Sequence, residues 1–189
     1  MSVNRIIFAV IAVIIGVLFL TYNRLVQLRQ ARQNAFADID VQLRQRYDLV
    51  PRLVETVKGY AAHEKGVMET VTAARAQVGS AQGDAGAARL QAESALGASI
   101  GRLLAVSENY PALKADASFQ QLMGELTNLE DKIAAARRFF NNATSEYNSS
   151  VQMFPANIFA GMFGFRTEPF FEIAAADKDA VNQAPDVKF

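Results

Sequence analysis

His63, the only histidine of the chain, is followed by Glu64 and is the one candidate for histidine-based metal chemistry. The helix of a zinc protease carries His-Glu-x-x-His, whose second histidine completes the zinc site. That position is occupied here by Val67. A di-iron site in a helical bundle needs two Glu-x-x-His pairs, which a single histidine cannot supply. We therefore expect His63 to be an ordinary helical residue, exposed or hydrogen-bonded, and we expect no metal site and no cofactor.

Paired carboxylates, another source of acid–base chemistry, occur at Asp38/Asp40 and at Glu130/Asp131. Side chains share a helix face when they are three or four residues apart, so neither pair can converge on a substrate. Both pairs are typical of solvated helix surface. The sequence also has no cysteine and none of the phosphate-loop, G-x-G-x-x-G or G-x-S-x-G patterns. We predict no catalytic residues and a protein that is not an enzyme.

The charges are balanced, with 19 basic and 19 acidic residues among 189. A nucleic-acid-binding protein usually has a clear basic excess, so nucleic acid is not an expected partner. Hydrophobic residues make up 51% of the chain and are unevenly spread. Every residue from Ile6 to Leu20 is hydrophobic except Gly16. This concentration indicates a membrane segment joined to a domain of ordinary globular composition.

The 18 uncharged residues between Arg5 and Arg24 would span roughly 27 Å as a helix, close to the hydrocarbon thickness of a bilayer. The alternative is a cleaved signal peptide, which has a shorter apolar region and a small-residue cleavage site. This run ends instead in Phe-Leu-Thr-Tyr, so we favour an uncleaved anchor with Tyr22 at the membrane interface. Basic residues are more numerous after the span than before it. The positive-inside rule then predicts a single-pass protein of the inner membrane, with its N-terminus outside and its domain in the cytoplasm.

The remaining chain is predicted to be helical, because it is rich in alanine and the whole chain has only five prolines. Apolar residues follow alternating steps of three and four, which is the seam of a helix packed lengthwise on others. The clearest seam comprises Phe119, Leu122, Leu126, Leu129, Ile133, Ala136, Phe140, Ala143 and Tyr147. Ser118 with Gln121 forms a capping box that would start this helix. Residues 79–86 and the stretch that begins at Asn109 are predicted loops.

Pro51 allows two interpretations, since an interior proline either kinks one long helix or separates two. The seam keeps its register across Pro51, which favours a kink, whereas matched segment lengths favour a break. The four matched segments are Arg24–Asp48, Pro51–Val78, Ala87–Asn109 and Ser118–Gln152. We predict an all-α protein in which an N-terminal transmembrane helix is followed by an antiparallel up-and-down four-helix bundle. The fourth segment would then end near the membrane.

Six of the 13 phenylalanines lie between Phe154 and Phe171. Pro155 suits the first turn of a short helix that Gly164 could end. This helix either closes the open end of the bundle or contacts the membrane or a partner, and both interpretations can hold if the fourth segment returns to the membrane. The candidate contact residues are Phe154, Pro155, Phe159, Phe163, Phe165, Phe170 and Phe171.

The basic residues that follow the span, Arg24, Arg29 and Arg32, are candidate contacts for anionic lipid headgroups. A mixed-charge helix face is the alternative. We expect residues 1–23 to form the anchor, 24–172 the helical bundle, and 173–189 a disordered tail.

Several stretches resemble the LemA family of bacterial membrane proteins. They include YNRLVQLRQARQNAFADIDVQLRQRYDLVPRLVETVKGYAAHE from Tyr22 to Glu64, AVSENYPALKAD, the segment around Arg137 to Tyr147, and FPANIFAGMFGFRTEPFFE. The resemblance implies a single N-terminal transmembrane helix, an outward-facing N-terminus and an antiparallel helical bundle. It implies no reaction and no catalytic residues. Phe36 stands where the family more often has tryptophan, which still provides a large aromatic side chain.

Two functions fit these features. The first is a non-enzymatic, membrane-anchored scaffold or adaptor that binds other membrane proteins. The second is a homo-oligomer that organises or remodels the membrane through its anchor and its aromatic stretch. In both, membrane lipid is one partner.

Overall fold

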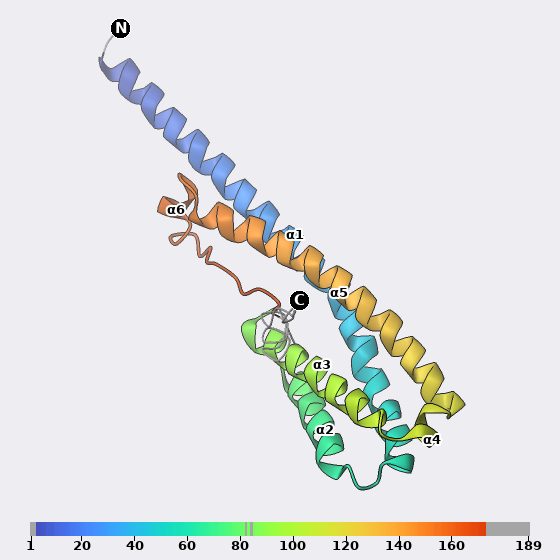
Figure 1. Cartoon of the computed structure of the whole chain (residues 1–189). Helices are drawn as coiled ribbons and strands as arrows, with labels where there is room; N and C mark the ends of the chain where they lie inside the picture. The colour runs from blue at the N-terminus through green and yellow to red at the C-terminus, as the bar shows by residue number, and fades with distance from the viewer. Residues whose placement is uncertain (1–2, 82, 84, 173–189) are drawn as a thin grey trace, which may run out of the picture.

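The computed structural model describes residues 3–81, 83 and 85–172, and it is helical without strands over that part of the chain. The long helices are α1 (Val3–Tyr60), α2 (Lys65–Ser80), α3 (Ala87–Ser107) and α5 (Ala117–Gln152), and the single-turn helices are α4 (Pro111–Lys114) and α6 (Ala156–Phe159) (Figure 1). The predicted all-α class and the predicted apolar N-terminal helix are therefore confirmed. The tail predicted to be disordered, 173–189, lies outside the described residues.

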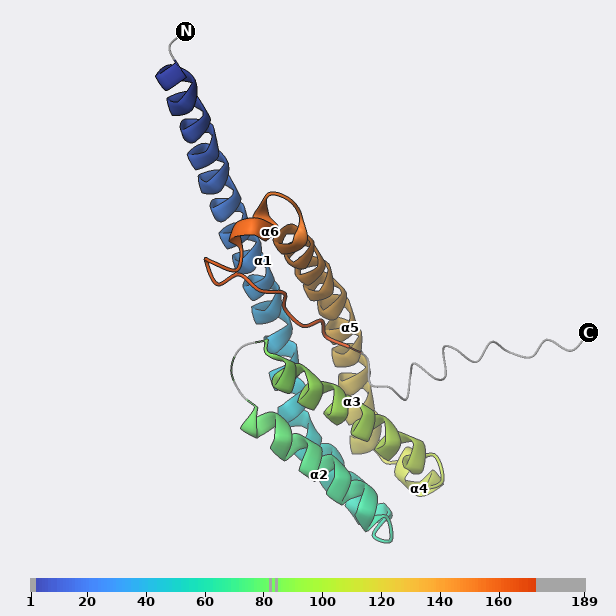
Figure 2. The same cartoon turned by 90° about the vertical axis from the view of Figure 1, so that its left-hand side faces the viewer.

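The α1 helix runs without a break through 58 residues. Its N-terminal part projects beyond every other element (Figures 1 and 2). An 18-residue window of this part has a mean hydropathy of 2.7 with none of it buried inside the protein. By length and composition this part of α1 can therefore cross a membrane.

Of the two interpretations of Pro51, the break is wrong, because α1 continues to Tyr60. A proline has no N–H, so the carbonyl of Tyr47, four residues earlier, loses its helical donor. Arg75 of α2 replaces it: its Nε donates a hydrogen bond to the Tyr47 carbonyl at 3.0 Å. The Arg75 guanidinium also lies 3.8 Å from the centre of the Tyr47 ring. Tertiary packing thus satisfies the backbone group that Pro51 frees, and the helix continues.

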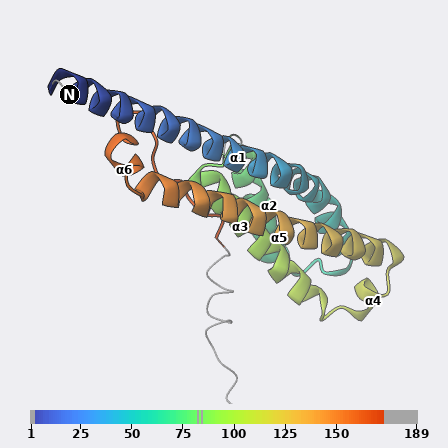
Figure 3. The same cartoon turned by 90° about the horizontal axis from the view of Figure 1, so that it is seen from above.

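In the half of the bundle distal to the apolar end of α1, α2 and α3 pack on each other and on α1, and α5 returns beside α1. Viewed from above, α1 and α5 run lengthwise side by side with α2 and α3 against them (Figure 3). The expected segments of matched length are not found, because residues 51–60 belong to α1 and leave α2 with only 16 residues. The buried core here includes Leu53, Val57, Val71, Leu96, Leu103, Leu113, Leu122 and Leu126.

In the proximal half, α1 and α5 are covered by an extended segment, residues 165–172, which we call the strap (Figure 1). Two asparagines of α5 hold it. The Asn148 side chain accepts from the Glu168 N–H at 2.8 Å and donates to the Glu168 carbonyl at 2.8 Å. The Asn141 side chain does the same to Phe171, at 2.9 and 3.1 Å. The two asparagine side chains therefore bond to the backbone N–H and carbonyl groups of Glu168 and Phe171, as a neighbouring β-strand would do in a sheet.

The start of α5 differs from the predicted capping box. Asp116, not Ser118, is the N-cap, and its carboxylate accepts the Phe119 N–H at 2.9 Å. This bond and a second one from the Tyr60 hydroxyl lower the pKa of the Asp116 carboxyl. The stabilisation from this cap is present above the ordinary pKa of aspartate and is lost as the pH falls through the lowered pKa. The same contact joins the end of α1 to the start of α5.

The role of Arg75 can be tested with a double-mutant cycle at Pro51. Arg75→Met should lower the free energy of unfolding by about 1 kcal/mol, because the Tyr47 carbonyl loses its donor. In a Pro51→Ala background the restored N–H can bond to that carbonyl, so the same substitution should cost less. Urea unfolding of the full chain in detergent, followed by circular dichroism, measures both. An equal loss in the two backgrounds would contradict this account.

Candidate functional site

The aromatic residues predicted to contact a membrane or partner divide into two groups. Phe154 is 78% exposed, and Phe163 and Phe170 are also exposed, while Phe159 and Pro155 are half-buried. Phe165 and Phe171 are only 3% and 2% exposed, because Phe165 packs against α1 and α5, and the Phe171 side chain points from the strap into the core formed by α1, α3 and α5. Those two residues therefore fill the protein's own core, and only the others are available for an external contact.

Residues 153–165, which we call the aromatic loop, are fixed to α1 at Tyr22. The Tyr22 ring makes edge contacts with Phe163 and Phe165, at centroid distances of 5.3 and 5.6 Å. Gly164 has a φ of 72°, the left-handed conformation that closes a helical turn and favours glycine. The Phe165 N–H bonds to the Ala160 carbonyl at 2.9 Å across this turn, which directs the Phe165 ring inward. The loop thus has one defined position beside the end of the apolar part of α1.

Two of the three candidate headgroup arginines already have protein partners near this loop. Arg24 forms an exposed ion pair with Glu146 of α5. Arg29 lies 4.2 Å from the centre of the Phe165 ring, and its Nη2 is 3.5 Å from the Gly164 carbonyl. Both residues therefore link α1 to the returning end of the chain, as well as standing just beyond the apolar span.

The prediction that Arg32 contacts lipid headgroups is wrong, because Arg32 is only 5% exposed and is held inside the protein. Its guanidinium donates to the Thr144 hydroxyl at 3.2 Å, to the Ala85 carbonyl at 3.0 Å and to the Pro169 carbonyl at 3.3 Å. These partners lie on α5, on the loop before α3 and on the strap. Arg32 therefore connects, inside the protein, elements that are far apart in the sequence.

A second internal cluster, which the sequence analysis missed, surrounds Arg46. Arg46 of α1 is 2% exposed and bonds to the fully buried Glu93 of α3 at 2.8 Å and to Glu130 of α5 at 3.1 Å. Glu93 also pairs with Arg89 at 2.9 Å, and Arg89 pairs with Asp40 of α1 at 2.9 Å. The expectation that Asp40 and Glu130 are simply solvated surface is therefore wrong. The sequence did contain a sign of this cluster. Arg46 stands between the apolar residues Leu43 and Val50 at steps of three and four, a position where an apolar core residue would be expected.

Gly97 makes room for this cluster. A Cβ at position 97 would lie 3.3 Å from Arg46 Nη1, tighter than an ordinary contact. The absence of a side chain at Gly97 thus admits the guanidinium of Arg46 from α1, whereas a Cβ at Gly101 would meet open space.

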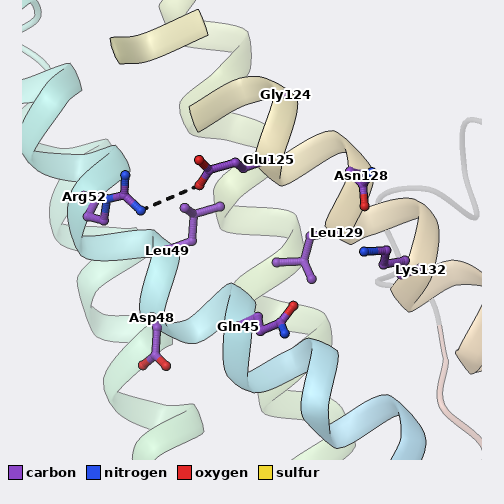
Figure 4. A pocket seen from close by; sticks show the side chains of 9 residues that line it. All are labelled: Gln45, Asp48, Leu49, Arg52, Gly124, Glu125, Asn128, Leu129 and Lys132. Carbon is purple, nitrogen blue, oxygen red and sulfur yellow. Dashed lines mark ion pairs between the residues drawn. The ribbon is translucent and has the colours of Figure 1, made fainter. Parts of the chain in front are cut away.

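An open groove of about 750 Å³ lies between α1 and α5 (Figure 4). Its floor has the apolar side chains of Leu49 and Leu129, and its rim is polar and charged. Arg52 and Glu125 pair across it at 3.6 Å, and Asp48 lies apart from Glu125 in Figure 4. This arrangement suits binding of a polypeptide surface better than acid–base chemistry, because no two carboxylates converge.

The remaining candidate, His63, lies exposed in the turn between α1 and α2. It was expected to be helical, and that expectation is wrong. Among the residues that the structure describes, no three His, Cys, Asp or Glu side chains are grouped in a way that could hold a metal ion.

Comparison with known proteins places this architecture in a family. The family model described as the LemA family matches residues 35–189. The chain belongs to the LemA family. The resemblance found in the sequence is thereby confirmed.

Relatives of this LemA-family chain include magnetosome proteins. Magnetosome protein MamQ of Magnetospirillum gryphiswaldense is 29% identical over 188 residues, which cover 86% of this chain and 69% of that protein. Magnetosome protein MamQ 1 of Paramagnetospirillum magneticum is 26% identical over 182 residues, covering 84% of this chain and 67% of that protein. Protein LemA of Metamycoplasma hominis is 23% identical over 168 residues, covering 87% and 76%. With the apolar end of α1, these relatives indicate a membrane-associated helical protein.

The Arg46 cluster predicts a large effect of a single substitution. Arg46→Met should destabilise the fold by about 3 kcal/mol, because buried Glu93 loses one of its two cationic partners. Adding Glu93→Leu should restore part of the loss, since the uncompensated charge is then removed. Urea unfolding of the full chain in detergent measures both. Arg44→Met, on the exposed face of the same helix, is the matched control and should change stability by less than about 0.5 kcal/mol. Equal effects at positions 44 and 46 would refute the role of the cluster.

Proposed function

We propose that this protein is a non-enzymatic, membrane-anchored scaffold whose helical domain, residues 24–172, holds partner proteins at a fixed distance from the inner membrane. The observation that carries the proposal is the continuity of α1, which runs from its apolar end into the centre of the bundle without a joint. From Tyr22 to Tyr60 the helix extends roughly 57 Å. A rigid rod of this length sets both the height and the orientation of the domain.

The proposed orientation places the domain in the cytoplasm and the N-terminus outside. Its support is the set of basic residues that directly follow the span, Arg24, Arg29 and Arg32, against Arg5 before it. The α5 helix returns toward the same end, so the domain lies entirely on one side of the proposed bilayer.

The groove between α1 and α5 is the surface we assign to the partner. It faces away from α2 and α3 (Figure 4), and a charged rim around an apolar floor is the usual anatomy of a protein interface. It lies in the distal half of the bundle, away from the aromatic loop. A partner bound there would be held away from the lipid surface.

Photo-crosslinking in native membranes tests the scaffold directly. A photoreactive amino acid at Asn128, on the groove, should capture one or a few proteins reproducibly, whereas the same amino acid at exposed Glu69 of α2 should capture none of them. Mass spectrometry identifies the captured chains. Capture of only a second copy of this chain would favour the homo-oligomer instead. Equal, unspecific capture from both positions would contradict the scaffold.

Single-cysteine variants can report the orientation in the membrane, because the native chain has no cysteine. A membrane-impermeant maleimide added to spheroplasts should label Asn4→Cys, and it should label Ala135→Cys on α5 only after permeabilisation. The reverse pattern would place the domain outside.

A further inference from the structure

The aromatic loop exposes an unusual number of large apolar side chains. Phe154 is 78% exposed and Met162 is 82% exposed. Met153, Ile158 and Phe163 are also exposed, so five such residues fall within the 11 residues 153–163. A water-soluble surface rarely concentrates apolar side chains in this way unless something covers them.

The loop sits at the level where the apolar part of α1 ends. Phe163 and Phe165 contact Tyr22, which lies two residues after the run from Ile6 to Leu20. If α1 crosses the bilayer, Tyr22 lies at the boundary between hydrocarbon and headgroups, where tyrosine is favoured. The exposed side chains of the loop then lie beside the same boundary.

The position of the loop is set by packing on its inner side. Ala156, Ala160 and Phe165 are buried with Leu25, Leu28, Tyr147 and Val151. The left-handed turn at Gly164 and the contact of Arg29 with the Phe165 ring hold its end. The buried and exposed residues therefore lie on opposite sides of one fixed element, in the manner of an interfacial helix.

Lipid is the occupant that this geometry favours over a protein partner. The exposed apolar surface of the loop is continuous, through Tyr22, with the apolar surface of α1. Arg166 is exposed next to the loop, and Arg29 stands beside it, so basic side chains lie where anionic headgroups would be.

We propose that the aromatic loop inserts into the interfacial layer of the leaflet that faces the domain, as a second membrane contact besides the α1 span. This inference rests on the proposed membrane anchor and adds to it. Two separate contacts on one rigid body fix the tilt of α1 and its rotation about its own axis, which a single helix cannot do. A lipid surface, rather than a soluble ligand, is thus the partner of the loop.

The test uses the full chain, which has no tryptophan. Single variants Phe154→Trp and Met162→Trp are reconstituted into vesicles whose phosphatidylcholine and phosphatidylglycerol carry bromine near the headgroup end of the acyl chains. Tryptophan emission should be quenched several-fold more strongly in these two variants than in the control Phe139→Trp. Phe139 is 61% exposed on α5 and lies 13 residues before its end, roughly 20 Å further along the helix.

Carbonate extraction and circular dichroism accompany each variant, so that the anchor and the fold are checked separately. Quenching at positions 154 and 162 but not at 139 supports the insertion. If the chain resists carbonate and keeps its helicity while neither loop position is quenched, the insertion is overturned and the anchor stands. If carbonate releases the chain, the proposed anchor fails and the insertion fails with it. Two probes at opposite ends of the loop keep the test valid if one substitution disturbs the turn.

Discussion

The α1 helix combines an apolar part that the protein does not cover with a part that packs in the bundle, and the placement of the other elements depends on this continuity. Its first part presents apolar side chains on all sides, none of them buried inside the protein, and is long and apolar enough to cross a membrane. Its remainder presents a single seam to the bundle, and α5 packs along that seam over most of its length. Because no loop separates the two parts, the direction of the apolar part fixes the direction of the domain. The break after Tyr60, and not Pro51, is where the chain first turns back.

Arginines in the seam select one arrangement of the helices around α1. Arg32 and Arg46 stand at positions that continue the alternating three and four spacing of Leu28, Ile39 and Leu43. Apolar seams of similar spacing can pack in several alignments, whereas a buried guanidinium needs particular acceptors. Arg32 finds them on α5, before α3 and on the strap, and Arg46 finds them on α3 and α5. The two residues therefore fix the positions of α3, α5 and the strap along α1.

The sequence was sufficient for the class, the apolar helix, the α5 seam and the family, because these depend on periodicity and composition. It left both a kink and a break open at Pro51, since the local rule for proline takes no account of a donor supplied by Arg75 from another helix. It also could not show that Asn141 and Asn148 hold the strap, because each bonds to backbone about 20 to 30 residues away. The site residues followed the same pattern. Exposed Phe154 and Phe163 fit the expectation of surface residues, whereas Arg32, Phe165 and Phe171 are buried by contacts that no local pattern encodes.

The rigidity of α1 is the central claim, and a distance between spin labels on Gln27→Cys and Glu55→Cys in a bilayer tests it most directly. Both positions are exposed on α1 and flank Pro51 and the Arg46 cluster. An unbroken helix of 28 residues predicts a single narrow distribution near about 42 Å. A markedly shorter or broad distribution would mean that α1 bends or breaks between the membrane and the distal bundle, and the rod on which the scaffold depends would not exist.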